Sequence, residues 1–308
     1  MQYLAVFGKP VLHSKSPQLF NSAFKSTGIK AFYTRIRPLS GENIIEIIKR
    51  TGITGANVTT PYKEDVIPFL DYISNDARLI GGVNTIVNQN GTLYGYNTDH
   101  YGVSRSLTEA GFTLHGLPCL VLGAGPAARA AVYGLMGKGA VVSITNRTFS
   151  KALSIANDFG CRAVEVERVN DIIGDVGIMV STILPGANPL SDVTLPDTLT
   201  VLDANYRVSQ FSIYADAYGC RIISGKRWLI NQAAESFKLF WGAEPDIAAL
   251  EDGLSIELDK NKLNAVAVTE KSQDINFSNV DLVVSLPSAQ LGCFNTFLDE
   301  EVYKAFGS

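Results

Sequence analysis

The chain has 308 residues, which is long enough for two domains that each bury a hydrophobic core. Hydrophobic residues make up 46% of it and charged residues 18%, as in ordinary globular proteins and unlike disordered or collagen-like chains. The formal net charge of -4, without any long run of like charges, argues against a nucleic-acid partner.

The cysteines and the apolar segments exclude further classes of protein. Cys119, Cys161, Cys220 and Cys293 are far apart and form no CxxC pair, so we expect reduced thiols rather than a zinc site or a disulfide framework. No apolar run approaches the roughly 18 residues of a membrane helix, and residues 1–10 lack the pattern of a signal peptide. We therefore predict no metal, no membrane partner and a cytoplasmic location.

The first hundred residues are expected to form a mixed sheet flanked by helices. Asn90-Gly91 between two short apolar runs is typical of a two-residue β-hairpin, because both central positions need a positive φ. Part of this sheet should therefore be antiparallel. We predict strands at residues 4–7, 32–36, 55–59, 83–88 and 92–96, and helices at 17–27 with Ser16 as cap, 42–50, 73–79 and up to 110 with Thr98 or Asp99 as cap.

From residue 117 strands alternate with helices of about ten residues, a pattern typical of a parallel, doubly wound sheet. A long amphipathic helix at 228–241 should end at Gly242. We predict further strands at residues 118–122, 140–145, 176–181, 199–202, 254–258, 264–268 and 282–286, and helices at 127–136, 150–159 and 297–306.

A glycine-rich loop joins the strand at 118–122 to the helix that follows. Gly123, Ala124, Gly125, Pro126 and Ala127 have the spacing of a dinucleotide-binding loop, in which glycines let backbone N–H groups approach a pyrophosphate at a helix N-terminus. Proline in the first helical turn removes no helical hydrogen bond. The alternative is a merely tight turn between strand and helix.

The next strand ends in Asn146, Arg147 and Thr148, about 20 residues after the glycines. NAD-binding proteins usually have an acidic residue there, which accepts hydrogen bonds from the ribose hydroxyl. A guanidinium and two short polar side chains suit the 2'-phosphate of NADP instead, since arginine binds phosphate in bidentate fashion. The alternative is that Arg147 is simply a solvated loop residue.

The first domain holds a second group of polar residues. Ser14 and Ser16, beside a helix N-terminus, could bind a carboxylate, or Ser16 could serve only as a helix cap. Asn84 lies in an otherwise apolar strand and needs a partner for its amide. Lys63 on its own is typical of a solvated side chain, and Asp99 on its own is compatible with a helix cap.

These motifs, taken in order, closely resemble the shikimate dehydrogenase family. The family patterns GxPxxHSxSPxxxN, NVTxPxK, GxVNT, NTDxxG, GAGxAARA, NRTxxKA and QAAxSFxxxxG occur at residues 8–21, 57–63, 81–85, 97–102, 123–130, 146–152 and 232–242. The resemblance covers residues 1 to about 246.

The resemblance implies NADPH-dependent reduction of 3-dehydroshikimate to shikimate, a step of aromatic amino-acid biosynthesis through chorismate. Lys63 and Asp99 match the family's catalytic pair, which exchanges the alcohol proton while the nicotinamide exchanges the hydride. The resemblance further implies contacts to the substrate carboxylate from Ser14, Ser16 and Tyr206, contacts to the ring hydroxyls from Thr59, Asn84 and Gln232, and contacts to the cofactor from Lys151 and Gly225.

The fold we predict is α/β with two domains. Residues 1–102 should form a mixed-sheet αβα substrate domain, completed by a returning helix at 228–246, and residues 103–227 a Rossmann-like doubly wound NADP-binding domain. The active site should lie in a cleft between the two domains. Residues 247–308 exceed the usual family length and are an extension of unknown role, for which an added α/β subdomain, an interaction surface and part of a fused domain are the alternatives.

Alternatives remain open at this level. A quinate/shikimate dehydrogenase using NAD or NADP would share the motifs, although such relatives often carry Thr at the second hydroxyl position, where this chain has Ser16. A non-catalytic ligand sensor on the same fold is a second alternative, against which the intact Lys63 and Asp99 argue. The chain departs from the family patterns at residues 181–186, 207–211 and 226–228, and both a monomer and a homodimer are compatible with it.

Overall fold

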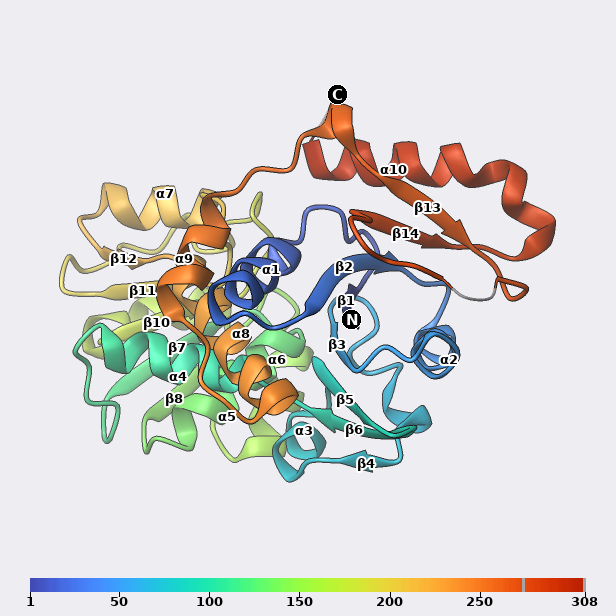
Figure 1. Cartoon of the computed structure of the whole chain (residues 1–308). Helices are drawn as coiled ribbons and strands as arrows, with labels where there is room; N and C mark the ends of the chain where they lie inside the picture. The colour runs from blue at the N-terminus through green and yellow to red at the C-terminus, as the bar shows by residue number, and fades with distance from the viewer. Residues whose placement is uncertain (273–274, 307–308) are drawn as a thin grey trace. The chain divides into compact units, whose positions relative to one another are not determined.

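The computed structural model describes residues 1–272 and 275–306, which form two compact units (Figure 1). Unit 1 comprises Met1–Asn97 and the described residues from Ala233 onward, and unit 2 comprises Thr98–Gln232. The units divide after residues 97 and 232, a few residues from the boundaries at 102 and 227 that the sequence suggested. None of the helices in the described part of the chain is both long and apolar enough to span a membrane.

Unit 1 is built on a mixed eight-stranded sheet. Neighbouring strands are parallel except β5, which is antiparallel to both of its neighbours, β3 and β6. Asn90 and Gly91 both have positive φ in the turn between β5 and β6, as predicted. In sheet order the strands are β13 (Ala265–Val268), β14 (Leu282–Ser285), β2 (Ala31–Arg37), β1 (Gln2–Phe7), β3 (Gly55–Val58), β5 (Thr85–Gln89), β6 (Thr92–Tyr96) and β4 (Tyr72–Ile73).

Helices cover both faces of this sheet because alternate strand residues are apolar on each side. On one face, Phe7 and Ile36 pack with the isoleucines of α2 (Gly41–Thr51). On the other, Phe20 of α1 (Ser16–Thr27) stacks on Tyr33 at 4.6 Å between ring centroids. The other helices of unit 1 are α3 (Asn75–Ile80), the C-terminal part of α8 (Gly225–Trp241), α9 (Ile247–Ser255) and α10 (Phe294–Phe306).

The segment after residue 246 belongs to unit 1 and extends its sheet. Strand β14 pairs with β2, so that β2 is an internal strand, and β13 forms the new edge (Figure 1). Phe277 and Val283 are fully buried in the core that contains Ile36. The predicted strands at 264–268 and 282–286 and the helix at 297–306 are confirmed.

Unit 2 is a doubly wound sheet of six parallel strands, as predicted. The strand order reverses between β7 and β10, and ligands bind beyond the carboxyl ends of the strands at such a point. The strands in order are β12 (Arg221–Ile223), β11 (Thr200–Asp203), β10 (Ile178–Ser181), β7 (Pro118–Leu122), β8 (Val141–Thr145) and β9 (Arg162–Val164); the helices are α4 (Asp99–Glu109), α5 (Pro126–Met136), α6 (Phe149–Phe159), α7 (Gln210–Ala217) and the start of α8.

Three local predictions are wrong. Ser16 is the first residue of α1 and not its cap, since Lys15 occupies the N-cap position and no side chain caps the helix. Thr98 stands at the N-cap of α4 without a capping hydrogen bond from its side chain, and Asp99 is already helical. The predicted strand at 254–258 begins within α9, because Asp246 caps a helix whose buried face packs on α1.

Candidate cofactor and substrate sites

A pocket of about 780 Å³ lies at the carboxyl ends of the strands of unit 2. It brings together the glycine-rich loop after β7 and the polar loop after β8, two segments the sequence analysis singled out separately. Seven predicted cofactor residues line it, namely Gly123, Ala124, Gly125, Asn146, Arg147, Thr148 and Lys151.

The glycines of this loop are required for different reasons. Gly123 has φ +117°, and a Cβ there would lie 2.3 Å from the Thr182 hydroxyl oxygen. Its amide donates to the Thr145 carbonyl at 2.9 Å, which fixes the loop to the neighbouring strand. A Cβ on Gly125 would meet nothing within 4 Å, so this residue leaves open space at the start of α5. A ligand could therefore approach the backbone of Gly125 closely.

Two helices begin at the pocket with their N-termini uncapped by side chains. Gly125 is the N-cap of α5 and Thr148 the N-cap of α6, and neither provides a capping hydrogen bond. By contrast, Ser209 caps α7 of the same unit through a complete capping box. Free N–H groups and the helix dipole favour anions at both helix starts, so the pocket suits a ligand with two separated phosphate groups.

The charged groups of the pocket are basic. Arg147 is exposed at its rim and forms no ion pair with any residue in the described part of the chain. Among the described residues, none that lines this pocket is acidic. A smaller cavity of about 490 Å³, which shares Arg147, does contain Glu167 and Asp192. The Asn146 side chain donates to the Thr148 carbonyl at 2.9 Å and holds the loop between them.

Three of the predicted cofactor residues do not line the pocket. Pro126 and Ala127 form the first turn of α5, and Gly225 begins α8. A Cβ on Gly225 would lie 2.6 Å from the carbonyl oxygens of Asp203 and Ala204. Ala204 lines the pocket, so Gly225 permits close packing behind the pocket wall.

The three segments that depart from the family patterns, residues 181–186, 207–211 and 226–228, lie at different places in unit 2. Residues 182–184 and 186 line the pocket, with Leu184 78% exposed. Ser209 donates to Asp203, whose other carboxylate oxygen accepts from the Asn205 side chain. Trp228 is buried against Gly102, where a Cβ would lie 2.4 Å from the indole ring. The departure at residues 181–186 therefore changes the surface of the pocket, and the departure at residues 226–228 changes the core of unit 2.

In unit 1, four predicted substrate-binding residues and the predicted catalytic Lys63 lie at one edge of the sheet. Strands β1 and β3 end there, and the antiparallel β5 begins there, because Phe7 pairs with Val58 and Asn57 pairs with Thr85. The loops beyond those strand ends carry Ser14, Thr59, Lys63 and Asn84, and Ser16 begins helix α1 directly after the loop of Ser14.

Backbone contacts tie these loops together. Thr59 donates its amide to the Phe7 carbonyl at 2.8 Å, and the Lys63 carbonyl accepts from the Val83 amide at 2.8 Å. The hydroxyl oxygens of Ser14 and Ser16 are 3.3 Å apart. Both are partly exposed, at the start of a helix that lacks a side-chain cap. This arrangement can bind a carboxylate through neutral donors and the helix dipole.

A buried polar network beneath this edge was not predicted from the sequence. The Asn57 amide accepts from the Tyr33 hydroxyl at 2.7 Å and donates to Thr85 and to Ser236 of α8, each at 3.0 Å. Burial raises the pKa of Tyr33 well above its ordinary value, which keeps the phenol protonated as a donor. The polar Asn57, Thr85 and Ser236 inside family motifs were the available signal. Their role is to join α8 to β3 and β5.

The other three predicted substrate or catalytic residues belong to unit 2. Asp99 is buried in the first turn of α4, Tyr206 is partly exposed after β11, and Gln232 lies on α8.

Comparison with known proteins identifies the family. Residues 6–86 match the model of the shikimate dehydrogenase substrate binding domain, and residues 106–189 match the model of shikimate / quinate 5-dehydrogenase. The curated shikimate dehydrogenase (NADP(+)) of Pyrococcus abyssi is 38% identical over 254 residues, which span 80% of this chain and 95% of that protein. The chain belongs to the shikimate dehydrogenase family.

Solved structures of the family have the same fold. The crystal structure of shikimate dehydrogenase from Aquifex aeolicus aligns with a TM-score of 0.79 at 32% identity, covering 83% of this chain and 98% of that one. Shikimate 5-dehydrogenase from Thermus thermophilus, in complex with NADP(H) and shikimate, aligns with a TM-score of 0.75 at 35% identity, covering 82% and 98%. In both comparisons nearly all of the relative is matched, whereas more than a sixth of this chain is not.

Proposed function

We propose that this chain is an NADP-dependent shikimate dehydrogenase, which catalyses the reversible reduction of 3-dehydroshikimate to shikimate in aromatic amino-acid biosynthesis. Family membership supports the reaction class, because relatives of 33–38% identity over most of their length are named for it. The dispersed cysteines and the biosynthetic role fit an enzyme of the cytoplasm.

The observation that carries the cofactor preference is the basic, acid-free pocket of unit 2. NADP differs from NAD by a 2'-phosphate, and Arg147 with the uncapped N-terminus of α6 offers a guanidinium and free N–H groups for it. The glycine loop and the N-terminus of α5 suit the pyrophosphate. When bound, the cofactor supplies the hydride that the reduction needs.

The substrate residues of unit 1 suit a small hydroxy acid. We assign the carboxylate to Ser14 and Ser16, whose hydroxyls lie together at the start of α1. Lys63 would give a proton to the carbonyl oxygen as it becomes a hydroxyl and would take it back in the reverse direction, with Asp99 holding the ammonium group in place. Tyr206 of unit 2 is assigned to the carboxylate as well. Thr59 and Asn84 at the same sheet edge, together with Gln232 of unit 2, are assigned to the ring hydroxyls.

The test is a set of initial rates with shikimate and quinate, each with NADP and NAD. We expect shikimate with NADP to have the highest kcat/KM. Quinate carries an extra hydroxyl on the carbon that bears the carboxylate, and a pocket fitted to shikimate leaves that group without a partner. Preference for quinate, or for NAD, would replace the proposal by the quinate/shikimate alternative, and binding without turnover would support a ligand sensor.

A further inference from the structure

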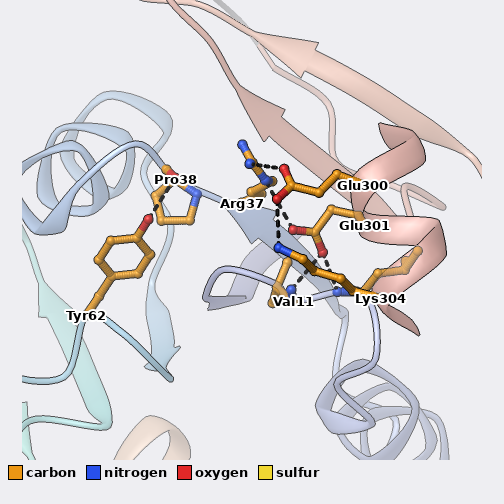
Figure 2. Close-up of polar contacts among 8 residues, drawn as sticks. Val11, Arg37, Pro38, Tyr62, Glu300, Glu301 and Lys304 are labelled. Atoms are coloured by element: carbon orange, nitrogen blue, oxygen red, sulfur yellow. Dashed lines mark hydrogen bonds and ion pairs between the residues drawn. The ribbon is translucent and has the colours of Figure 1, made fainter. Parts of the chain in front are cut away.

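The loop that carries Ser14 and leads into Ser16 at the start of α1 is held by the C-terminal segment of the chain. Glu301 of α10 is 1% exposed, and its Oε2 accepts a hydrogen bond from the amide of Val11 at 2.8 Å (Figure 2). Through the same oxygen, Glu301 accepts from the amide of Leu12 at 3.0 Å. Its other oxygen accepts from Arg37 Nε at 3.1 Å. One carboxylate therefore satisfies two consecutive backbone donors of the loop and a buried guanidinium.

The anchored residues Val11 and Leu12 lie three and two positions before Ser14 in the chain. Ser14 donates its amide to the Val11 carbonyl at 2.9 Å, so residues 11–14 form a turn that starts at the Glu301 contact. A shift of Val11 and Leu12 would therefore move Ser14, and with it Ser16, whose amide donates to the Ser14 hydroxyl at 3.3 Å.

Two further contacts connect the same loop to residues after 246. Arg35 is buried and donates through Nε and Nη2 to the Ser14 carbonyl at 3.0 and 2.6 Å. Its third nitrogen, Nη1, points to the carbonyl of Asp281, at 3.4 Å, just before β14. Lys15, between the serines, pairs with Glu257 at 2.8 Å. The loop is thus held on both sides of Ser14 by the C-terminal segment.

We propose that Glu301 is a positioning residue for substrate binding, which fixes the carboxylate-binding serines through the backbone of Val11 and Leu12. The inference rests on the proposed function, since it assumes that Ser14 and Ser16 bind the substrate carboxylate. It assigns a role in the reaction to the segment after residue 246, which in this chain is part of unit 1.

The neighbouring Glu300 provides a matched control. Its carboxylate also bonds to Arg37, through Nη2 at 2.8 Å, but it has no bond to the loop (Figure 2). Lys304 and then Arg37 hold the pKa of Glu300 below its ordinary value, so it is a carboxylate at neutral pH. Glu300→Gln and Glu301→Gln each remove one negative charge beside Arg37, but only the second also disturbs the bonds to Val11 and Leu12.

The experiment measures the kinetics of both variants in the full chain. We expect Glu301→Gln to raise the KM for shikimate by about tenfold or more while kcat and the KM for NADP stay within about twofold, because binding of the carboxylate is common to ground and transition states. Glu300→Gln should change all three by less than about twofold. Equal KM values for shikimate in the two variants would overturn the proposal.

Coupling to Ser14 separates positioning from a general loss of stability. In a Ser14→Ala background, Glu301→Gln should raise KM by less than about twofold more, because residues that act through one contact are not additive. Full additivity would overturn the proposal.

If Glu301→Gln does not fold, Glu301→Asp keeps the charge beside Arg37 and shortens the reach by one methylene. It should show the same selective rise in KM, and a KM like that of Glu300→Gln would overturn the proposal.

Hydrogen exchange gives a result that does not depend on turnover. The amides of Val11 and Leu12 should exchange faster in Glu301→Gln than in Glu300→Gln, because only the first variant disturbs their acceptor. If the wild-type protein turns over shikimate and Glu301→Gln changes neither the KM for shikimate nor the exchange of these amides, the positioning role of Glu301 is refuted while the proposed function stands. A wild-type protein that does not turn over shikimate would refute the proposed function and with it the effect on KM, and unchanged exchange would then refute the anchor as well.

Discussion

Replacing Arg147 by Ala tests the cofactor pocket most directly. The guanidinium is exposed at the pocket rim and forms no ion pair with the described residues, so the change removes a phosphate ligand without leaving a buried partner. The effect should be confined to the group that distinguishes the two cofactors. Because only NADP carries the 2'-phosphate, its binding should weaken while that of NAD stays nearly unchanged.

The magnitude follows from the type of bond and its exposure. Hydrogen bonds to charged groups contribute about 1.5–3 kcal/mol, and a solvent-exposed guanidinium belongs in the lower part of that range. A loss of about 2 kcal/mol corresponds to roughly thirtyfold in apparent affinity. The backbone N–H groups at the start of α6 remain in the variant and should retain part of the preference for NADP.

The assay compares KM values for NADP and NAD at saturating shikimate. Arg168→Ala is the matched control: it removes the same charge from unit 2, from an exposed residue that pairs with Asp171 and does not line the pocket. It should change neither KM by more than about twofold. Equal losses for NADP and NAD in Arg147→Ala, or equal effects of the two substitutions, would show that Arg147 does not contact the 2'-phosphate.

Three further predictions concern the catalytic groups and the thiols. Lys63→Ala should lower kcat by about 100-fold or more with little change in the KM for shikimate. Combining it with Asp99→Asn should lower kcat little further, because the two residues act as one unit. A near-normal kcat in Lys63→Ala would refute the proposed proton transfer. Ser16→Thr should raise the ratio of kcat/KM for quinate to kcat/KM for shikimate, and an unchanged ratio would show that Ser16 does not select between the two substrates. Burial raises the pKa of the Cys119 thiol to about 12, so iodoacetamide at pH 8 should label the exposed Cys293 and leave Cys119 unlabelled until the protein unfolds, as peptide mass spectrometry would show.

The sequence predicted unit 2 well because its signals are local. Each strand is a short apolar run followed by a helix, and the glycine loop lies where such a unit binds phosphates. The pocket then follows from topology, since β7 and β8 are adjacent and parallel and their loops meet at one edge. Packing between distant segments has no such local signal: the contact between Trp228 and Gly102 joins residues of two helices far apart in the chain.

Helix starts were predicted less well. A serine before a proline is typical of an N-cap, yet Ser16 is helical and its amide donates to the Ser14 hydroxyl. Glu301, Arg35 and the contact of Lys15 with Glu257 fix the preceding loop from outside the helix. Tertiary contacts of this kind override local capping preferences.

Strand β2 shows why the role of residues after 246 could not be predicted. Arg35 and Arg37 are two residues apart, and charged residues with that spacing are typical of a strand face in contact with water. Both are only 2% exposed. Their acceptors include Asp281 and Glu301, which follow more than 240 residues later in the chain. Nothing near Glu301 in the sequence distinguishes it from a surface glutamate of an amphipathic helix.

The burial of this pair makes α10 a requirement of the fold around it. A buried ion pair adds little stability over an apolar pair of the same volume, but removing one partner leaves an uncompensated charge and costs about 3–5 kcal/mol. Arg37 is enclosed by Glu301, Glu300 and the ring of Phe297, all from α10. The charge of Arg37 in β2 therefore needs either the carboxylates of α10 or access to water. The same groups that neutralise Arg37 also hold the backbone before Ser14, so the stability of the sheet and the geometry of the serine loop depend on one set of contacts.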